Sequence, residues 1–249
     1  MRASSLPDPM SLPALPLAPG TGRGTVLFVE GPETWSVPEQ DAVVLAVREG
    51  WWPRLEIVSQ GVRACVTDGS GLASRPSLGV AAVGGIDRDL LRPGEVVEVD
   101  GTAGRLNIEG VSEQPVVTAL LERADGKILL LRRSDRVGSF RGRWAGVSGF
   151  LETPEPLDQA LTEVREETGL PPTALRLVRS GRCVLARDGA RVYVVHPFLF
   201  RVERAEVRLD WEHTDAEWVD PEEITRRQTV PKLDRVWKAL AGPADARKS

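Results

Sequence analysis

Apolar residues in the first part of the chain fall into short runs separated by glycine and proline. Between Thr25 and about Gly110 these runs are typical of strands rather than helices. We expect strands over residues 26–29, 42–47, 62–66, 96–99 and 105–108, and one short helix over residues 52–60. Residues 1–19 are rich in proline, leucine and serine without periodicity, so they predict a disordered tail. A β-rich domain over residues 20–112 follows from this pattern.

The pattern changes after Val116. Apolar runs over residues 116–123 and 127–132 flank Ala124-Asp125-Gly126 and predict a β-hairpin. Further strands are expected over residues 191–202, 207–211 and 216–219, and helices over residues 221–227 and 231–241, each opened by a proline. Strands mixed with helices predict a second domain of the α/β (α+β) class over residues 113–243, with a tail over residues 244–249.

One helix of the second domain carries both start and stop signals. Pro154 and Pro156 fit only the first turn of a helix, and Gly169 fits the left-handed position just past its end. Between them, apolar residues recur at helical spacing, so we expect this stripe to pack on the sheet. The stripe consists of Leu157, Ala160, Leu161, Val164 and Thr168.

Three carboxylates of this helix, Glu163, Glu166 and Glu167, stand at positions i, i+3 and i+4. That spacing predicts one acidic patch on the side away from the apolar stripe. Like charges so placed destabilise a helix by about 0.2–0.5 kcal/mol per pair, and Mg²⁺ is a hard cation that prefers oxygen ligands. The helix by itself leaves two interpretations open: a metal site, or an ordinary solvated acidic face.

The segment from Gly149 to Leu170 resembles the Nudix box, G-x5-E-x7-R-E-U-x-E-E-x-G-U, in which U is apolar. Residues 163–170 match E-U-x-E-E-x-G-U in full, and Gly149 with Glu155 matches the leading G-x5-E. The resemblance covers about residues 113–241. It implies the fold of the Nudix hydrolases, an α/β/α sandwich with a mixed sheet.

Two departures from the pattern lie in its first half. The stretch from Glu155 to Glu163 is one residue shorter than in the family, so the chain must enter the helix more tightly. Thr162 stands where the family has an arginine that helps to orient the neighbouring carboxylate, and threonine does not reach that far. Both departures favour an alternative function, a catalytically weak Nudix-like module that binds or senses a nucleotide.

The resemblance also implies roles for individual residues. Glu163, Glu166 and Glu167, with the backbone of Gly149, would ligate Mg²⁺, for which Mn²⁺ could substitute. Glu163 would also position the attacking water, and Glu212, in a late loop, is our candidate for a further catalytic base. The candidates for substrate binding are Arg132, Arg133 and Arg141, which suit phosphates, and Trp144, which suits a nucleobase. Surface charge for the arginines and core packing for the tryptophan are the ordinary alternatives.

The implied reaction is the Mg²⁺-dependent hydrolysis of a nucleoside diphosphate linked to a further moiety. Water would attack a diphosphate phosphorus, and the metal would polarise the diphosphate and lower the pKa of the water. The expected partner is therefore a nucleotide or a nucleotide-derived diphosphate. The sequence does not identify the further moiety, because the family varies its substrates through loops outside the box.

The first domain resembles, more weakly, the swivelling β/β/α domain of phosphoenolpyruvate-utilising enzymes. The matching segments are residues 41–46, 61–71, 78–84 and 94–101, in that order. That family has a phosphorylatable histidine after a serine in a glycine-rich loop, where this chain has Ser74-Arg75. The only histidines, His196 and His213, lie in the other domain. The resemblance therefore implies the fold without the phosphohistidine chemistry, and leaves open a docking module or a phosphate-binding arginine.

Composition restricts the partners further. The formal net charge of −4 does not favour nucleic acid as a partner. No stretch approaches the roughly 20 apolar residues that span a membrane, and the N-terminus lacks the apolar core of a signal peptide. Cys65 and Cys183 lie far apart, which is typical of free thiols in a reducing compartment, so we expect a cytoplasmic protein. The apolar strands leave room for a homodimer.

Overall fold

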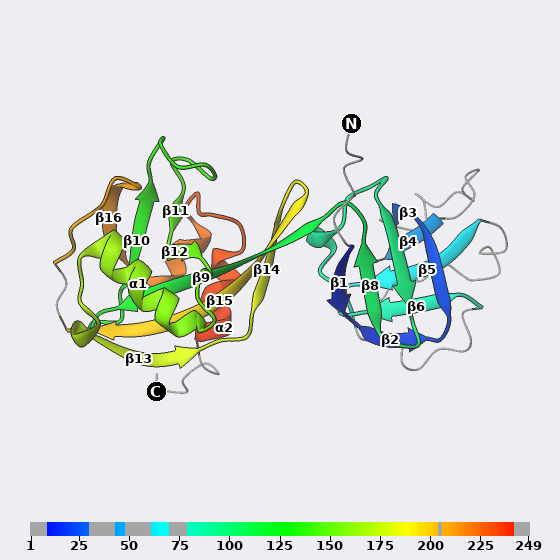
Figure 1. Ribbon diagram of the computed structural model, residues 1–249, viewed down its shortest axis with the longest axis horizontal. Helices are drawn as coiled ribbons and strands as arrows, with labels where there is room; N and C mark the ends of the chain where they lie inside the picture. Colours follow the sequence, from blue (N-terminus) through cyan, green and yellow to red (C-terminus); the bar gives the residue numbers. More distant parts are fainter. Residues whose placement is uncertain (1–8, 30–42, 48–60, 70–78, 204–205, 242–249) are drawn as a thin grey trace. The chain divides into compact units, whose positions relative to one another are not determined.

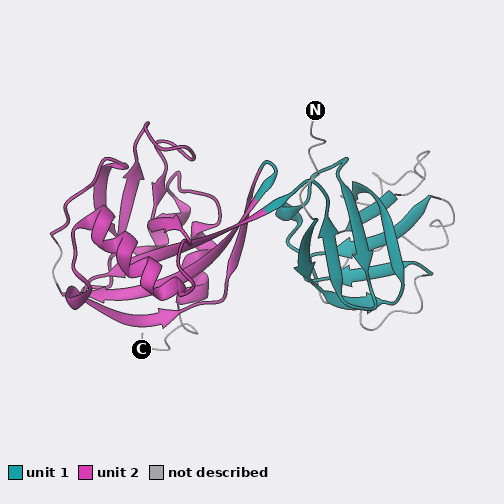
Figure 2. Cartoon of the chain, viewed as in Figure 1, with its two compact units in different colours: residues 1–112, 189–191 teal, residues 113–188, 192–249 magenta. Residues whose placement is uncertain are grey.

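The chain divides into two compact units. The computed structural model describes residues 9–29, 43–47, 61–69, 79–203 and 206–241. Unit 1 comprises residues 1–112 and 189–191, and unit 2 comprises residues 113–188 and 192–249 (Figure 2). The division falls between Ser112 and Glu113, close to the change of sequence pattern.

Unit 1 is built on an eight-stranded sheet in the order β1-β8-β7-β3-β4-β5-β6-β2 (Figure 1). The strands are β1 (Met10–Pro13), β2 (Leu15–Ala18), β3 (Thr21–Val29), β4 (Val43–Val47), β5 (Val62–Thr67), β6 (Ala81–Gly84), β7 (Val96–Asp100) and β8 (Arg105–Ile108). β3, β4, β5 and β6 pair in parallel, and the outer pairs are antiparallel. The five strands expected in this domain are confirmed.

The prediction of a disordered tail over residues 1–19 is wrong for residues 10–18. β1 pairs with β8 and β2 with β6, and Met10 and Leu12 are only 3% and 2% exposed. Proline has no N–H to donate to a neighbouring strand, so sheets accept it mainly in edge strands, at positions that face away from the sheet. Pro13 and Pro16 lie in such edge strands. Within the described part of unit 1 the helical structure is a 3₁₀ turn, η3 (Arg88–Leu90). The helix expected over residues 52–60 lies outside the described residues, as do the crossovers between the parallel strands.

Unit 2 contains a second eight-stranded sheet. Its strands are β9 (Ser112–Glu122), β10 (Ile128–Arg133), β11 (Trp144–Ala145), β12 (Val147–Phe150), β13 (Leu175–Ser180), β14 (Val184–Asp188), β15 (Arg191–Val202) and β16 (His213–Val219). The central order is β11-β10-β9-β15-β13, while β12 pairs with β9, β14 with β15 and β16 with β10. The helices are α1 (Pro156–Thr168) and α2 (Leu233–Leu240), with 3₁₀ turns η4 (Pro172–Ala174) and η5 (Pro221–Thr225).

The two α-helices of unit 2 cover opposite faces of this sheet. Successive side chains of a strand point to opposite faces, and β9 divides accordingly: Leu121 packs in one apolar cluster with Val164 of α1, and Leu120 in another with Val236 of α2. The alternation continues along β10 and β15. Unit 2 is therefore the α/β/α sandwich that the sequence predicts.

Three expectations for the end of unit 2 need correction. Residues 207–211 form no strand; Val207 and Leu209 pack against the α1 cluster instead, so their apolar character reflects burial rather than sheet pairing. The helix expected over residues 221–227 is the shorter 3₁₀ turn η5, and the last helix begins at Leu233 rather than Pro231. None of the helices in the described ranges is long and apolar enough to cross a membrane.

Candidate active site

Local signals fix the ends of helix α1, which carries the acidic residues. The helix starts after Glu155 with proline at its first turn, and it ends at Gly169, whose φ of 71° is left-handed. The Gly169 N–H donates to the Arg165 carbonyl at 2.9 Å. The predicted ends are confirmed at Pro156 and Gly169, whereas Pro154 lies before the helix instead of in its first turn. The apolar stripe packs on the sheet, so the final turns of α1 lie beside β12, the strand of Ser148 and Gly149.

The three glutamates of α1 occupy different environments. The side chain of Glu166 is 59% exposed and Glu163 is half-buried, but the side chain of Glu167 is only 4% exposed. The expectation of a single patch opposite the stripe is therefore wrong for Glu167. At 3.6 residues per turn it lies one turn after Val164, on the border of the buried stripe. Its Oε1 accepts the backbone N–H of Ser148 at 3.1 Å.

A buried glutamine orients Glu163. Gln159, which is 5% exposed, donates from Nε2 to Oε1 of Glu163 at 2.7 Å, and its own Oε1 accepts the Glu152 N–H at 3.3 Å. Thr162 instead donates to the Asp158 carbonyl within its own helix. Gln159 therefore holds the carboxylate that the missing arginine was expected to orient. The i, i+4 spacing was visible in the sequence as a signal for this contact.

Gly149 lies directly against the same carboxylate. A Cβ added at this glycine would stand 2.0 Å from both Cδ and Oε1 of Glu163, far inside contact distance. Only glycine allows the backbone of β12 and this carboxylate to approach so closely. The first glycine of the sequence motif is thus explained by a side chain fourteen positions later.

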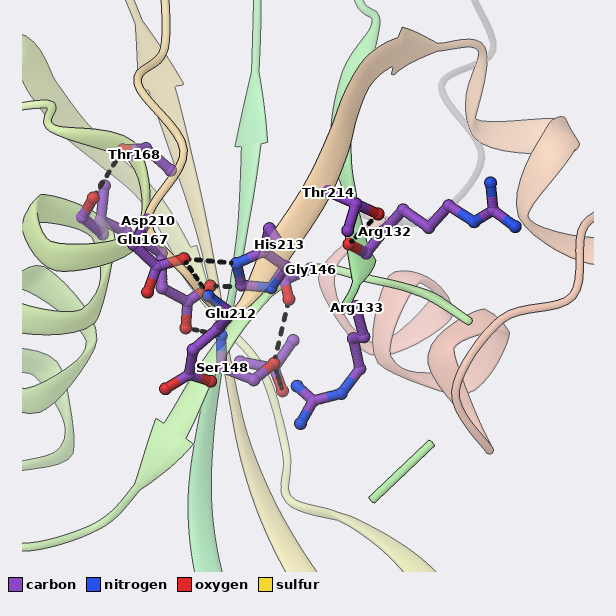
Figure 3. Close-up of polar contacts among 12 residues, drawn as sticks. Arg132, Arg133, Gly146, Ser148, Glu167, Thr168, Asp210, Glu212, His213 and Thr214 are labelled. Atoms are coloured by element: carbon purple, nitrogen blue, oxygen red, sulfur yellow. Dashed lines mark hydrogen bonds and ion pairs between the residues drawn. The ribbon is translucent and has the colours of Figure 1, made fainter. Parts of the chain in front are cut away.

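The loop before β16 brings a further carboxylate to the site. The Glu212 carbonyl accepts the Ser134 N–H at 2.6 Å, and its N–H donates to Oδ1 of Asp210 at 3.0 Å. A β-bulge then sets His213 opposite Arg133. Nδ1 of His213 lies 3.0 Å from Asp210 Oδ1, and its Nε2 faces Glu167 Oε2 at 3.5 Å (Figure 3). No motif or spacing in the sequence predicts the contacts of Asp210 and His213.

Burial dominates the electrostatics of these groups. Desolvation raises the pKa of Glu167 well above its ordinary value, against the lowering effect of the Ser148 N–H. Desolvation also raises the pKa of Glu163; Gln159 opposes this shift, and Glu166 and Glu212 add to it. The pKa of His213 is lowered, again mainly by burial. The site therefore concentrates carboxyl groups whose charged forms a bound cation would stabilise.

A pocket of about 420 Å³ adjoins the acidic groups. Glu152, Glu163, Glu166 and Glu212 line it together with Gly149. Arg133, Phe140 and Tyr193 also line this pocket. The rings of Phe140 and Tyr193 meet edge to face, with centroids 6.2 Å apart. The pocket thus joins a carboxylate-rich part, two arginines (Arg133 and Arg187) and an aromatic wall.

The other residues expected to bind substrate lie elsewhere. Arg132 and Arg133 are successive strand residues, so their side chains diverge (Figure 3), and Arg132 Nε donates to the Gly142 carbonyl at 3.3 Å. Arg141 donates to the Val137 carbonyl at 2.8 Å. Trp144 packs on the α2 cluster, with the Arg227 guanidinium 5.0 Å from its ring. Arg132, Arg141 and Trp144 are not among the described residues that line the pocket.

Unit 2 is an α/β/α sandwich in which the acidic helix α1 lies beside β12, the strand that contains Gly149. The NUDIX domain family model matches residues 112–240, just over half of the chain, and the chain belongs to the Nudix family. It is a hydrolase that acts on pyrophosphate bonds. The nucleoside triphosphatase NudI of Escherichia coli is 30% identical over 121 residues, which are 45% of this chain and 85% of that protein.

Solved structures of Nudix proteins are also similar. The MutT protein from Methanosarcina mazei Go1 has 25% identity and a TM-score of 0.44, covering 53% of this chain and 98% of its own. A C. elegans Ap4A hydrolase binary complex has 16% identity and a TM-score of 0.45, covering 51% and 94%.

Proposed function

We propose that unit 2 is a Mg²⁺-dependent pyrophosphohydrolase for a nucleoside diphosphate linked to a further moiety. Glu163, Glu166 and Glu167, with the Gly149 backbone, would hold the ion, and Mn²⁺ would substitute for it. The observation that carries this proposal is the environment of Glu167. A carboxylate buried to this extent keeps Oε2 without a hydrogen bond among the described residues, and such a group normally has a partner.

The other residues present also fit a hard cation. Glu163 and Glu166 border the same pocket and offer the carboxylate oxygens that Mg²⁺ prefers. The absence of a Cβ at Gly149 lets the backbone of β12 lie close to the Glu163 carboxylate. Across the described ranges, no three acidic, histidine or cysteine side chains already stand together as a ligand set. We therefore expect the exposed side chain of Glu166 to move when the metal ion binds.

The chemistry assigned to the chain is proton removal, orientation and charge balance. When bound, Mg²⁺ would neutralise diphosphate charge and acidify the attacking water. Glu212 or Glu163 would take the proton of the water as its oxygen bonds to phosphorus. The P–O bond of the anhydride then breaks, and the electron pair leaves with the bridging oxygen. The products are a nucleotide and a phosphorylated second product. Arg133 would pair with a phosphate oxygen.

The pocket supports a nucleotide as substrate. The phosphates of the substrate would lie near Glu163 and Arg133. The nucleobase would then lie against Phe140 and Tyr193, whose aromatic rings suit stacking. The name of the E. coli relative adds nucleoside triphosphates to the substrates to test. Arg132, Arg141 and Trp144 are assigned no direct contact with substrate.

A screen that separates the nucleotide and the phosphorylated second product by ion-exchange chromatography tests the proposal. Purified protein is assayed on nucleoside triphosphates, nucleotide sugars, dinucleotides and dinucleoside polyphosphates, with Mg²⁺, Mn²⁺ or EDTA. We expect metal-dependent turnover of at least one class, lost in the double variant Glu166→Gln/Glu167→Gln. Equal turnover by that variant would remove the metal assignment. Tight nucleotide binding in calorimetry without turnover under any metal would instead favour the sensor function, which the shortened helix entry near Glu155 supports.

Unit 1 is proposed to be a swivelling-type domain that does not transfer a phosphoryl group. The parallel order β3-β4-β5-β6 supports a β/β/α fold, because parallel strands need crossover connections, which are usually helices. Ser74 and Arg75 lie outside the described residues. A cytoplasmic location is supported by Cys65 and Cys183, both free thiols. A homodimer stays a prediction that sedimentation of the full chain would test.

A further inference from the structure

Two buried polar side chains, His213 and Glu167, lie behind the candidate metal site together with the partly exposed Asp210. Asp210 lies 3.0 Å from Nδ1 of His213, and Nε2 of His213 lies 3.5 Å from Oε2 of Glu167 (Figure 3). The His213 side chain is 1% exposed and that of Glu167 is 4% exposed. Neither Nε2 nor Oε2 has a hydrogen bond among the described residues. Two facing orphan atoms in the interior require an explanation.

Donor and acceptor counting assigns the ring nitrogens. An ionised carboxylate only accepts hydrogen bonds, so the close Asp210 oxygen fixes the ring proton on Nδ1. Nε2 is then the nitrogen that faces Glu167. The arrangement fixes the imidazole from one side by a carboxylate and directs its other nitrogen at a second carboxylate. Metal-binding carboxylates are commonly held by outer partners of this kind, and losing the partner typically weakens metal binding about 10–100-fold.

We infer that His213 is a positioning residue for Glu167, anchored by Asp210, and that it sets the affinity of the candidate metal site. This inference rests on the proposed function of unit 2. His213 limits the positions open to the free Oε2 of Glu167, while the Ser148 N–H holds Oε1 at 3.1 Å. The carboxylate is thereby held from two sides, by β12 and by β16, before any ligand arrives.

Asp210 also holds the backbone of Glu212, the candidate base. Asp210 Oδ1 also accepts the N–H of Glu212 at 3.0 Å, and the Glu212 carbonyl accepts the Ser134 N–H at 2.6 Å. Asp210 therefore fixes the imidazole of His213 and the backbone of Glu212 together. A change at His213 should act first on the metal ligand Glu167, whereas a change at Asp210 should disturb both sides of the pocket.

Two substitutions distinguish the contribution of Nε2 of His213 from that of Nδ1. Glutamine at position 213 has an amide that reaches the place of Nε2 and can limit the same positions of Glu167 Oε2, whereas asparagine reaches only the place of Nδ1, near Asp210. Mn²⁺ affinity of the full chain is measured without substrate by electron paramagnetic resonance for wild type, His213→Ala, His213→Gln and His213→Asn. His196→Ala is the matched control, since the chain's other histidine contacts Cys183 and does not line the pocket.

We expect His213→Ala to weaken Mn²⁺ binding about 10–100-fold, His213→Gln to restore most of it, and His213→Asn to bind as weakly as the alanine variant. Thermal melts identify variants that fail to fold; the comparison of glutamine with asparagine, both polar, then decides. Equal Mn²⁺ affinity in all folded His213 variants, with wild type binding normally, overturns the inference and leaves the proposed function standing. Wild type that binds no Mn²⁺ overturns both.

Discussion

Replacing Glu167 with glutamine should stabilise the metal-free protein while it removes a proposed metal ligand. The amide keeps an oxygen for the Ser148 N–H and offers an N–H to Nε2 of His213, which faces the carboxylate at 3.5 Å. Leaving a buried polar group unsatisfied costs about 1–3 kcal/mol. Glu167→Gln should therefore raise the free energy of unfolding by about 1–3 kcal/mol, a large fraction of the total for a domain of this kind.

The gain should depend on pH in a defined direction. Burial raises the pKa of Glu167 in the folded protein above the ordinary carboxyl value of 4.5. Between the ordinary and the raised pKa, the folded state binds a proton that the unfolded state has lost. By linkage, the stability of the wild type falls as the pH rises through that interval. Glu167→Gln has no such proton, so its advantage should be smallest near the ordinary pKa and largest above the raised one.

Urea denaturation in EDTA at about pH 5 and about pH 8 measures both effects. Glu166→Gln is the matched control, because that side chain is 59% exposed and exposed substitutions usually change stability by less than about 0.5 kcal/mol. A Glu167→Gln protein no more stable than wild type at the higher pH would refute the argument from the orphan oxygen. So would a gain that is the same at both pH values.

Three further predictions concern the site and the thiols. Gly149→Ala should lower kcat at least about tenfold with little change in melting temperature, because the new Cβ displaces only the flexible end of Glu163; kinetics and melts on one preparation check this. Gln159→Leu should weaken Mn²⁺ binding by about tenfold, measured by titration, since Glu163 loses its 2.7 Å hydrogen bond. A thiol reagent should label Cys183 in the native protein and Cys65 only after denaturation, as burial raises the pKa of the Cys65 thiol to about 12.

Helix α1 was predictable because its determinants are local. Pro156 and Gly169 fix its ends through the backbone conformations that each allows, and the apolar stripe fixes its buried face. β1 and β2 were missed for the opposite reason. Their partners, β8 and β6, lie far along the chain, and a four-residue run interrupted by proline carries too little alternation to identify a strand. Long-range pairing supplied the stability that the local pattern lacks.

In the candidate site, too, the sequence predicts the local features and tertiary packing decides the others. The spacing of Glu163, Glu166 and Glu167 predicted a group of carboxylates, but only packing against β12 decides that Glu167 is buried and Glu166 exposed. Arg132 and Arg133 were indistinguishable as sequence, and the direction of strand β10 brings only Arg133 to the pocket. The contact of His213 with Glu167 arises where β16 pairs with β10, with a bulge that no local motif marks.

The unpaired Oε2 of Glu167 should also make the relative stability of wild type and Glu167→Gln depend on the metal ion. A ligand that binds only the folded state stabilises it by about 2.7 kcal/mol at a hundredfold excess over its Kd. Mg²⁺ should therefore stabilise the wild type, whose Glu167 carboxylate gains a counter-charge, and leave Glu167→Gln nearly unchanged. In EDTA the variant should be the more stable protein, and in excess Mg²⁺ that order should narrow or reverse. Melting curves of both proteins in the two buffers test this, and equal Mg²⁺-induced shifts would mean that the ion, if bound, does not use Glu167.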